Sequence, residues 1–375
     1  VELPTLMPPD AQLERIATRI AGQAGLIICG PGRFGAEFAP SVTRLAEKLN
    51  CPLLADPLSG LRFGDHDRAR ILCHYDAFLR RAAFCNRYRP QWVLRFGSMP
   101  VSRSLLHYLQ HLQSGKLIVV DPYGRWPDPL HRTGEMLRAT PQAVCDGLAA
   151  RIACPTPDGW WEAFSRQEQV SAQLCHDLGV SGHWFEAQLV PALLDRLPAD
   201  SLLFAGNSMP VRELDSFSGQ FEKPLQLVAN RGASGIDGHV SSLLGLASAS
   251  ADDTTVAGLI GDLAFYHDMN GLLAAPDCNA TLIIINNDGG GIFRYLPQAG
   301  LDAFERYWST PTGLDFRHAA DLYRLPFRRV GRADEFQQAL NDSLSQQGVK
   351  IIEAVINPQH SVERHRAYWE AVCNH

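Results

Sequence analysis

The 375-residue sequence predicts an α/β protein built from two doubly wound parallel-sheet domains. Short apolar runs recur along the chain and are continuous rather than alternating, which is typical of strands buried on both faces of a parallel sheet. Helical stretches separate these runs, so strand and helix alternate as in doubly wound folds. The chain is also long enough for two domains, each with its own core.

The first predicted domain covers residues 1–155 and is Rossmann-like. It begins with a helix after Pro9, because apolar residues recur on one helical face. These residues are Leu13, Ile16, Ala17 and Ile20. The predicted strands that follow are residues 26–29, 52–56, 92–96 and 117–121.

A linker is predicted over residues 156–182, where a Pro- and Gly-containing stretch precedes a Gln-rich helical connector. The second predicted domain then covers residues 183–375. Its predicted strands are residues 201–205, 225–229, 255–260, 280–285, 327–330 and 350–356. Because parallel sheets bind ligands beyond the carboxyl ends of their strands, the residues that follow these strands are the candidates for function.

Composition excludes several classes of protein. The net charge of −6 and the lack of a lysine-rich block give no reason to expect nucleic acid. No apolar run approaches the roughly 18 residues of a membrane span, and the first residues lack the basic and apolar regions of a signal peptide. The nine cysteines are an odd number with no Cys-x-x-Cys pair, which favours reduced thiols and a cytoplasmic protein.

A glycine-rich loop in the first domain has the spacing of a dinucleotide fingerprint. Residues 30–35 run Gly-Pro-Gly-Arg-Phe-Gly after a predicted strand, and Asp56 follows 21 positions after Gly35. Against this interpretation, Pro31 stiffens the turn, and two bulky residues would crowd a pyrophosphate. We therefore favour a purely structural turn and keep nucleotide or effector binding as the alternative.

Two neighbouring strand ends in the second domain carry the strongest signal. Gly261-Asp262 closes the run at residues 255–260, and Asn287 lies 25 positions after Asp262, within the loop 286–291. A carboxylate, an amide oxygen and a freed loop carbonyl suit Mg²⁺, or Mn²⁺, that shares its shell with phosphate oxygens. The glycines after Asn287 allow a phosphate to approach the backbone. The alternative is an ordinary strand end with a capping Asp and a glycine turn.

Two further polar clusters follow strands of this domain. In residues 206–212, Ser208 is placed to cap the next helix and to donate to a ligand oxygen, and Arg212 could bind a carboxylate. In residues 230–238, three glycines surround Ile236, an aliphatic residue that looks exposed. The alternatives are a capped helix with a solvated arginine, and a flexible turn whose isoleucine belongs to the core.

The Gly-Asp and Asn-Asn pairs resemble the diphosphate-binding motif of thiamine-diphosphate enzymes. The strings Asn-Ser-x-x-x-Arg and Asn-Arg-Gly-Ala-Ser-Gly-Ile-Asp-Gly are similar to those of one group in that family, the 2-succinyl-5-enolpyruvyl-6-hydroxy-3-cyclohexene-1-carboxylate synthases of menaquinone biosynthesis. The likeness is strong after residue 200 and weak before residue 150.

This resemblance implies a role for each motif residue. The metal ligands would be Asp262, Asn287 and the Gly289 carbonyl, with Gly261, Ile236, Ile292, Phe293 and Leu296 against the cofactor. Ser208, Arg212 and Arg231 would be catalytic, and Asn207 and Arg103 would bind substrate, Arg103 on the loosest part of the alignment. Three arginines suit substrates that carry several carboxylates, because Arg binds them bidentately and stays charged.

The resemblance also implies the reaction and the assembly. Such enzymes are transferases that use thiamine diphosphate and Mg²⁺ to decarboxylate 2-oxoglutarate and add the product to isochorismate. They carry an activating Glu on an N-terminal pyrimidine-binding domain and form homodimers or homotetramers. No such domain precedes residue 1, so we expect the chain to be part of a longer enzyme and inactive alone.

Other functions remain open at this point. The chain could belong to another thiamine-diphosphate carboligase or decarboxylase, such as an acetolactate-synthase relative, which the donor substrate would distinguish. It could also be a non-catalytic module that binds Mg²⁺–diphosphate. A third possibility is a dinucleotide-dependent oxidoreductase, and the only support for it is the glycine-rich loop at residues 30–35.

Overall fold

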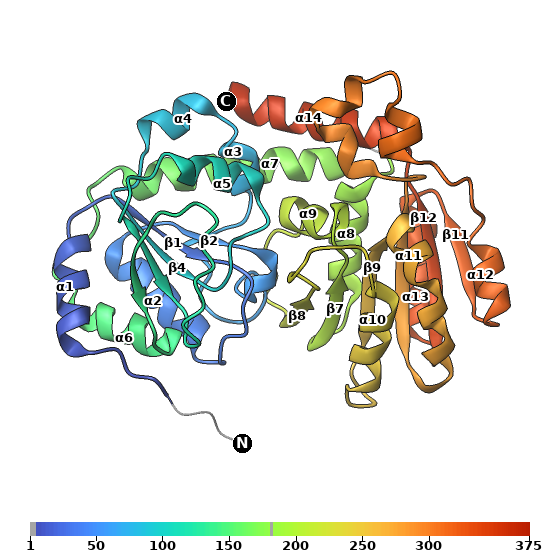
Figure 1. The fold of residues 1–375 in the computed structure, drawn as a ribbon, viewed down its shortest axis with the longest axis horizontal. Coiled ribbons are helices and arrows are strands. Elements are labelled where there is room, and N and C mark those ends of the chain that lie inside the picture. Colours follow the sequence, from blue (N-terminus) through green and yellow to red (C-terminus); the bar gives the residue numbers. More distant parts are fainter. Residues whose placement is uncertain (1–4, 181–182) are drawn as a thin grey trace. The chain divides into compact units, whose positions relative to one another are not determined.

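The computed structural model describes residues 5–180 and 183–375, so the last two positions of the predicted linker lie outside the described residues. The chain divides into two compact units (Figure 1). The first contains Val1–Leu174, Gly219–Glu222 and Trp369–His375, and the second contains Cys175–Ser218 and Lys223–Tyr368. Each unit is built on a six-stranded parallel sheet, which confirms the predicted fold class.

The sheet of the first unit has the strand order β3-β2-β1-β4-β5-β6, the order of the doubly wound dinucleotide-binding folds. Its strands are β1 (Gly25–Cys29), β2 (Leu53–Ala55), β3 (Ile71–Leu72), β4 (Trp92–Phe96), β5 (Leu117–Val120) and β6 (Thr133–Leu137). The helices are α1 (Asp10–Ile20), α2 (Phe38–Leu49), α3 (Tyr75–Phe78), α4 (Ala82–Arg87), α5 (Arg103–Gln110), α6 (Pro141–Arg151) and α7 (Trp160–Val180), with a 3₁₀ turn, η1 (Pro57–Ser59).

The first core forms where α1, α2 and α6 pack together on one face of this sheet. The four apolar residues that predicted α1 are all buried in this core. The strands β1, β2 and β4 are fully buried, as their continuous apolar sequences require. The predicted linker region forms the long helix α7.

Two strands of the first sheet were not predicted. β3 is only two residues long, and β6 has the sequence Thr-Gly-Glu-Met-Leu, in which one residue is buried. Both lie at the edges of the sheet. The apolar pair of β3 is too short to show a pattern, and β6 lacks the continuous apolar run that identifies the central strands.

The sheet of the second unit has the strand order β11-β12-β10-β9-β7-β8. Its strands are β7 (Ser201–Ala205), β8 (Leu225–Val228), β9 (Val256–Gly261), β10 (Ala280–Asn286), β11 (Phe327–Val330) and β12 (Val349–Val355), all predicted to within two residues. The helices are α8 (Glu186–Arg196), α9 (Met209–Phe217), α10 (His239–Ser248), α11 (Asp262–Asp268), α12 (Arg317–Leu322), α13 (Ala333–Leu344) and α14 (Pro358–Asn374). The residues of α14 from Trp369 onward belong to the first unit, and those of α7 from Cys175 onward belong to the second. Shorter turns are η2 (Met269–Asp277), η3 (Gly291–Tyr295), η4 (Pro297–Gly300) and the π-helical η5 (Glu305–Ser309).

The order of this second sheet creates a switch point between β7 and β9. The chain leaves β7 toward β8 on one side and returns as β9 on the other side, where β10 then pairs with β9. At such a point the connections at the carboxyl ends of the two strands diverge and leave a crevice for a ligand. The loops after β7, β9 and β10 therefore define the candidate site.

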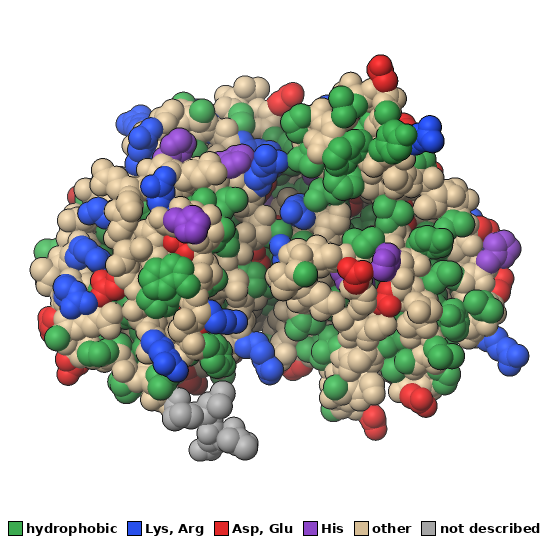
Figure 2. Space-filling view, in the orientation of Figure 1, with side chains coloured by type: hydrophobic (Ala, Val, Ile, Leu, Met, Phe, Trp, Pro, Cys, Tyr) green, Lys and Arg blue, Asp and Glu red, His purple; other side chains and the backbone are tan. Residues whose placement is uncertain are grey.

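The surface has no dominant charge on the face shown in Figure 2, where basic and acidic side chains are interspersed among apolar ones. This agrees with the modest net charge of −6. Within residues 5–180 and 183–375, no helix combines the length and the apolar character that crossing a bilayer requires.

Candidate functional site

The carboxylate of Asp262 lies at the centre of the candidate site. Asp262 is the first residue of α11, directly after β9, and it is buried. Its Oδ2 accepts a hydrogen bond from the Gly289 N–H at 2.8 Å, and its Oδ1 accepts one from the Leu263 N–H at 2.7 Å. Because β9 and β10 are parallel neighbours, residues 27 positions apart in the sequence meet directly.

Burial controls the ionisation of this carboxyl group. Desolvation raises the pKa of Asp262 to about 6, although the backbone N–H groups of Gly289 and Leu263 oppose the rise. No cationic side chain of the described residues forms an ion pair with it. A buried carboxylate balanced only by N–H dipoles favours a nearby cation, since a cation restores the electrostatic stabilisation lost with water.

The loop after β10 wraps around Asp262 in a conformation that only glycine adopts easily. Gly289 has a φ of +128°, and a Cβ there would lie 2.0 Å from the Ser309 carbonyl oxygen. Its own carbonyl accepts from the Gly291 N–H at 2.9 Å, which leaves the second lone pair of that oxygen for a ligand. The Asn287 side chain lies against Gly291, whose added Cβ would be 2.4 Å from its Nδ2.

Gly261, unlike Gly289, is not required to be glycine by its backbone conformation or by its neighbours. Its φ of −76° suits any residue, and a Cβ added there would meet nothing within 4 Å. The fold alone therefore does not require glycine at this position. The open space beside the backbone, next to Asp262, is what a diphosphate group needs in order to approach closely.

Asn207 follows β7 and organises the loop at residues 230–238. Its Nδ2 donates to the carbonyl oxygens of Asn230 at 2.8 Å and Gly235 at 2.7 Å, and its Oδ1 accepts from Arg231 at 2.6 Å. Since Asn207 is buried and its amide is engaged on both sides, it acts on the site by fixing this loop. The structure thus brings Asn207 and Arg231 together, as part of one network.

The prediction that the Ser208 side chain caps the next helix is wrong. Ser208 is the N-cap residue of α9, but its side chain makes no capping hydrogen bond. Capping requires extended backbone angles, whereas Ser208 has φ 69° and ψ −125°, a strained conformation for a residue other than glycine. One turn later, Arg212 donates from a guanidinium nitrogen to the Ser208 carbonyl oxygen at 2.5 Å, which places the arginine over the helix start.

The apolar residues predicted to contact a cofactor are all partly exposed. Ile236 packs against the core of the second unit without being buried in it. Ile292 and Phe293 lie in η3, and Leu296 directly follows this turn. The Phe293 ring makes an edge contact with Trp308, with ring centroids 5.3 Å apart. Partial exposure at these positions is consistent with surfaces that a bound group would cover.

The first unit holds the remaining predicted residues. Arg103 is exposed at the start of α5, so it is not among the residues that the second unit assembles.

In the glycine-rich loop, a Cβ on Gly30 would lie 1.7 Å from the Ser98 carbonyl oxygen. The Asp56 carboxylate accepts from the N–H groups of Leu58 and Val101, both at 2.8 Å. Gly30 and Asp56 therefore have structural roles, in line with the structural interpretation of this loop.

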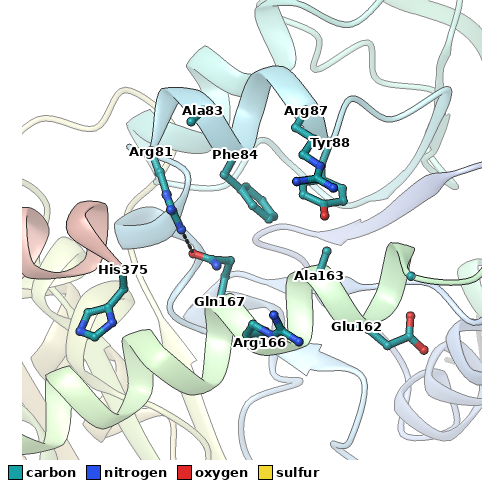
Figure 3. Close-up of a pocket in the computed structure, with 11 residues that line it drawn as sticks. Arg81, Ala83, Phe84, Arg87, Tyr88, Glu162, Ala163, Arg166, Gln167 and His375 are labelled. Carbon is teal, nitrogen blue, oxygen red and sulfur yellow. Dashed lines mark hydrogen bonds between the residues drawn. The ribbon is translucent and has the colours of Figure 1, made fainter.

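A separate cavity of about 480 Å³ also belongs to the first unit (Figure 3). It lies between α4 and α7, and three of its lining residues are Arg81, Arg87 and Arg166. None of the site residues predicted from the sequence lines it.

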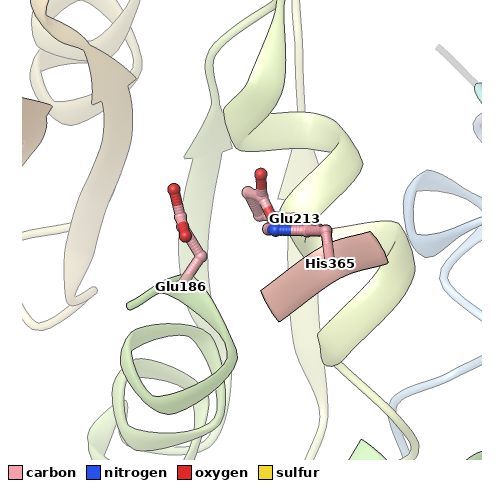
Figure 4. A group of neighbouring side chains, drawn as sticks. All are labelled: Glu186, Glu213 and His365. Carbon is pink, nitrogen blue, oxygen red and sulfur yellow. Dashed lines mark hydrogen bonds and ion pairs between the residues drawn. The ribbon is translucent and has the colours of Figure 1, made fainter. Parts of the chain in front are cut away.

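Several residues of the second unit were not anticipated. His239 is buried beside Asn207, with its Nε2 3.4 Å from the Asn207 Nδ2. Glu186, Glu213 and His365 form a buried cluster (Figure 4). A lone histidine after a glycine turn gives no distinctive sequence signal, and the cluster joins positions more than 150 residues apart, which no local pattern reveals.

Comparison with known families identifies the class of protein. Residues 9–205 match a family model described as "Middle domain of thiamine pyrophosphate", and residues 215–354 match the "Thiamine pyrophosphate enzyme, C-terminal TPP binding domain". The chain belongs to the thiamine pyrophosphate enzyme family. A structure from Mycobacterium smegmatis, ascribed by its name to a thiamin diphosphate-dependent enzyme, has the same fold, with a TM-score of 0.63 and 17% identity over 96% of this chain and 66% of that one.

Curated relatives of the chain share one name within that family. The chain is 42% identical to the 2-succinyl-5-enolpyruvyl-6-hydroxy-3-cyclohexene-1-carboxylate synthase of Geobacillus kaustophilus, over 94% of this chain and 61% of the relative. It is 38% identical to the synthase of the same name from Listeria innocua, over 97% of this chain and 63% of the relative. The resemblance predicted from the sequence is confirmed. The chain spans about three fifths of the length of these relatives.

Proposed function

We propose that the protein takes part in the reaction for which these relatives are named, as a thiamine-diphosphate- and Mg²⁺-dependent synthase. It would decarboxylate 2-oxoglutarate and join the remaining four-carbon unit to isochorismate. The observation that carries this proposal is the meeting of Asp262 with the loop at Gly289. The strand next to β9, β7, is followed by Asn207, which fixes an arginine-bearing loop.

The residues of the site fit a metal-bound diphosphate. Asp262 offers a buried carboxylate, Asn287 an amide, and Gly289 a carbonyl with one lone pair in use, which are the hard oxygen donors that Mg²⁺ or Mn²⁺ accepts. The open space at Gly261 suits the diphosphate oxygens. We propose these three side-chain and backbone oxygens as the metal ligands.

The chemistry of bond cleavage and formation would come from thiamine diphosphate, which supplies a nucleophilic carbon and an electron sink when bound. The chain's own residues bind and orient the reactants. Arg212 and Arg231 would pair with substrate carboxylates, and Ser208 would donate a hydrogen bond to a substrate oxygen. Ile236 would contact the cofactor, since it is anchored on the core and partly exposed.

Substrate use tests the proposal directly. We expect the complete protein, with thiamine diphosphate and Mg²⁺, to release CO₂ from 2-oxoglutarate and to form a joined product only when isochorismate is added. Pyruvate is the matched donor, because it lacks the distal carboxylate. Preference for pyruvate would indicate an acetolactate-synthase-like enzyme, and cofactor binding without turnover of either donor would indicate a non-catalytic module.

Substitution of Gly261 by Ala should separate binding from folding. Because the added methyl group meets no protein atom, we expect the free energy of unfolding to change by less than about 0.5 kcal/mol. The methyl group would occupy space that we assign to the diphosphate, so the Kd for thiamine diphosphate should rise about tenfold or more. Urea unfolding and calorimetric titration of the same sample measure the two effects. An unchanged Kd would place the diphosphate elsewhere.

A further inference from the structure

The buried cluster of Glu186, Glu213 and His365 links several elements of the second unit (Figure 4). Glu186 begins α8, Glu213 lies on α9, and His365 lies on α14. Each residue is at most 1% exposed, and the three ligand-type atoms lie within 4.8 Å of one another. Burying three ionisable groups is costly unless their charges compensate, so the arrangement calls for an explanation.

The hydrogen bonds of His365 indicate that its ring carries two protons. Nδ1 lies 2.7 Å from the Ser361 carbonyl oxygen, which can only accept, so Nδ1 carries a hydrogen. Nε2 lies 2.9 Å from Oε2 of Glu213. A neutral ring protonated on Nδ1 would set a lone pair against this carboxylate. A proton or a metal ion must therefore lie between the two atoms. Because imidazole is a stronger base than a carboxylate, we place a proton on Nε2.

Other polar groups complete the network around the ring. The Tyr295 hydroxyl lies 3.1 Å from Nδ1 of His365, and the Ser361 hydroxyl donates to Oε2 of Glu186 at 2.8 Å. Oε1 of Glu213 is buried and has no hydrogen-bond partner in the described part of the chain. Glu213 therefore depends on the imidazolium for its compensation, which makes the pair sensitive to loss of the histidine.

The charges within the network support this state. Burial alone would lower the pKa of His365, but the carboxylates of Glu213 and Glu186 raise it to about 9. Burial and the charge of Glu213 raise the pKa of Glu186 to about 7. The groups that face the ring are Glu213 from α9, Glu186 from α8, Tyr295 from η3 and Ser361 from its own helix.

The network is connected to α9, which carries Arg212, and to η3, which carries apolar residues proposed to contact the cofactor. Glu213 directly follows Arg212 on α9, and Tyr295 is the last residue of η3, which also contains Ile292 and Phe293. A cavity of about 10 Å³ is lined by Glu186 and Tyr295 and also by Asn287, so the cluster lies next to the loop of the proposed metal site.

We propose that doubly protonated His365 is a positioning residue that holds α9 through Glu213 and η3 through Tyr295. It thereby sets Arg212 toward the substrate and Ile292 and Phe293 toward the cofactor. The assignment of substrate and cofactor to these residues rests on the proposed function. The network of His365 does not, because it is defined by the hydrogen bonds described above.

Conservative variants of the complete protein test the contact with α9 and the contact with η3 separately. We expect His365→Gln to raise both the KM for 2-oxoglutarate and the Kd for thiamine diphosphate about tenfold, with kcat reduced less than about threefold. Glu213→Gln should raise mainly the KM, because it loosens α9. Tyr295→Phe removes one hydroxyl group, keeps the ring, and should raise mainly the Kd.

A second histidine–glutamate pair provides the matched control. Nδ1 of His74 lies 2.8 Å from Oε1 of Glu168 in the first unit, and both side chains are largely buried. His74→Gln should lower stability as His365→Gln does, while the KM and the Kd stay unchanged. Equal effects of the two variants on these constants, or no effect of His365→Gln, would overturn the proposal.

The pH dependence gives an independent readout. A raised folded-state pKa means that His365 contributes its stabilisation fully below about pH 6.5, and that this contribution is lost as the pH rises through about 9. The wild-type Kd should therefore rise above pH 9, and the His365→Gln profile should be flat there. A stoichiometric metal ion in the purified protein that His365→Gln removes would show that a metal, not a proton, bridges the cluster, and would refute the proposal.

The calorimetric Kd does not require turnover. If the wild-type protein fails to use 2-oxoglutarate, the proposed function falls, and the Kd values of His365→Gln and Tyr295→Phe still decide whether the network positions η3. If 2-oxoglutarate is used and these variants behave as wild type, only the positioning role falls.

Discussion

Asp262→Asn should weaken the binding of Mg²⁺–thiamine diphosphate at least about 100-fold, which corresponds to about 2.7 kcal/mol. The substitution removes the only carboxylate among the proposed ligands. It also replaces one acceptor oxygen by an NH₂ group, which then faces either the Gly289 or the Leu263 N–H. Calorimetric titration of the complete protein with thiamine diphosphate in excess Mg²⁺ measures the loss.

The folded state should survive this substitution. Removing a buried charge relieves its desolvation cost, and this gain opposes the lost backbone hydrogen bond, so we expect the melting temperature to change by only a few degrees, about 2–4 °C. The control is Asp268→Asn at the other end of the same helix, where the carboxylate accepts from the N–H and hydroxyl of Ser241. Asp268→Asn should leave the Kd unchanged, and an equal loss for both variants would contradict a specific role for Asp262.

Gly289→Ala should damage both the fold and the site. A φ of +128° is strained for alanine, and the new Cβ would meet the backbone carbonyl of Ser309 at 2.0 Å, where no flexible side chain can move aside. We expect the free energy of unfolding to fall by about 3 kcal/mol or more. Cofactor binding should fall as well, because the Gly289 N–H and carbonyl would both be displaced.

Urea unfolding measures this loss, and Gly300→Ala is its control. Gly300 ends η4, and a Cβ there would meet nothing within 4 Å. We expect Gly300→Ala to change stability by less than about 0.5 kcal/mol. If Gly289→Ala were as stable as Gly300→Ala, the described path of the loop around Asp262 would be wrong.

The sequence predicted the central strands and the meeting of their polar ends because both follow from short-range rules. A continuous apolar run identifies a buried parallel strand, and parallel neighbours bring their carboxyl ends to one edge. The position of Asp262 beside the loop that holds Gly289 therefore follows from the sequence, and the two residues are joined by a hydrogen bond. The spacing of the motif then indicated the chemistry.

Other features depend on tertiary structure that no local pattern encodes. Ser208 has a positive φ where β7 passes into α9, outside the extended angles of a capping residue, so its side chain does not cap the helix as the ordinary preference of serine suggests. The short edge strand β3 carries too few residues to show a period. Glu186, Glu213 and His365 come from three helices, and only the packing of α8, α9 and α14 makes them one network.

The hydrogen bond between Asp262 and the Gly289 N–H has a thermodynamic consequence for recognition. The loop after β10 is already held in place by this bond and by the contact of the Gly290 N–H with the Ser309 carbonyl oxygen at 2.6 Å. The entropy of ordering the loop is therefore lost during folding and not during association. Binding of the metal and diphosphate at this loop should accordingly show the small heat-capacity change of docking to a rigid surface, without the large negative value of coupled folding.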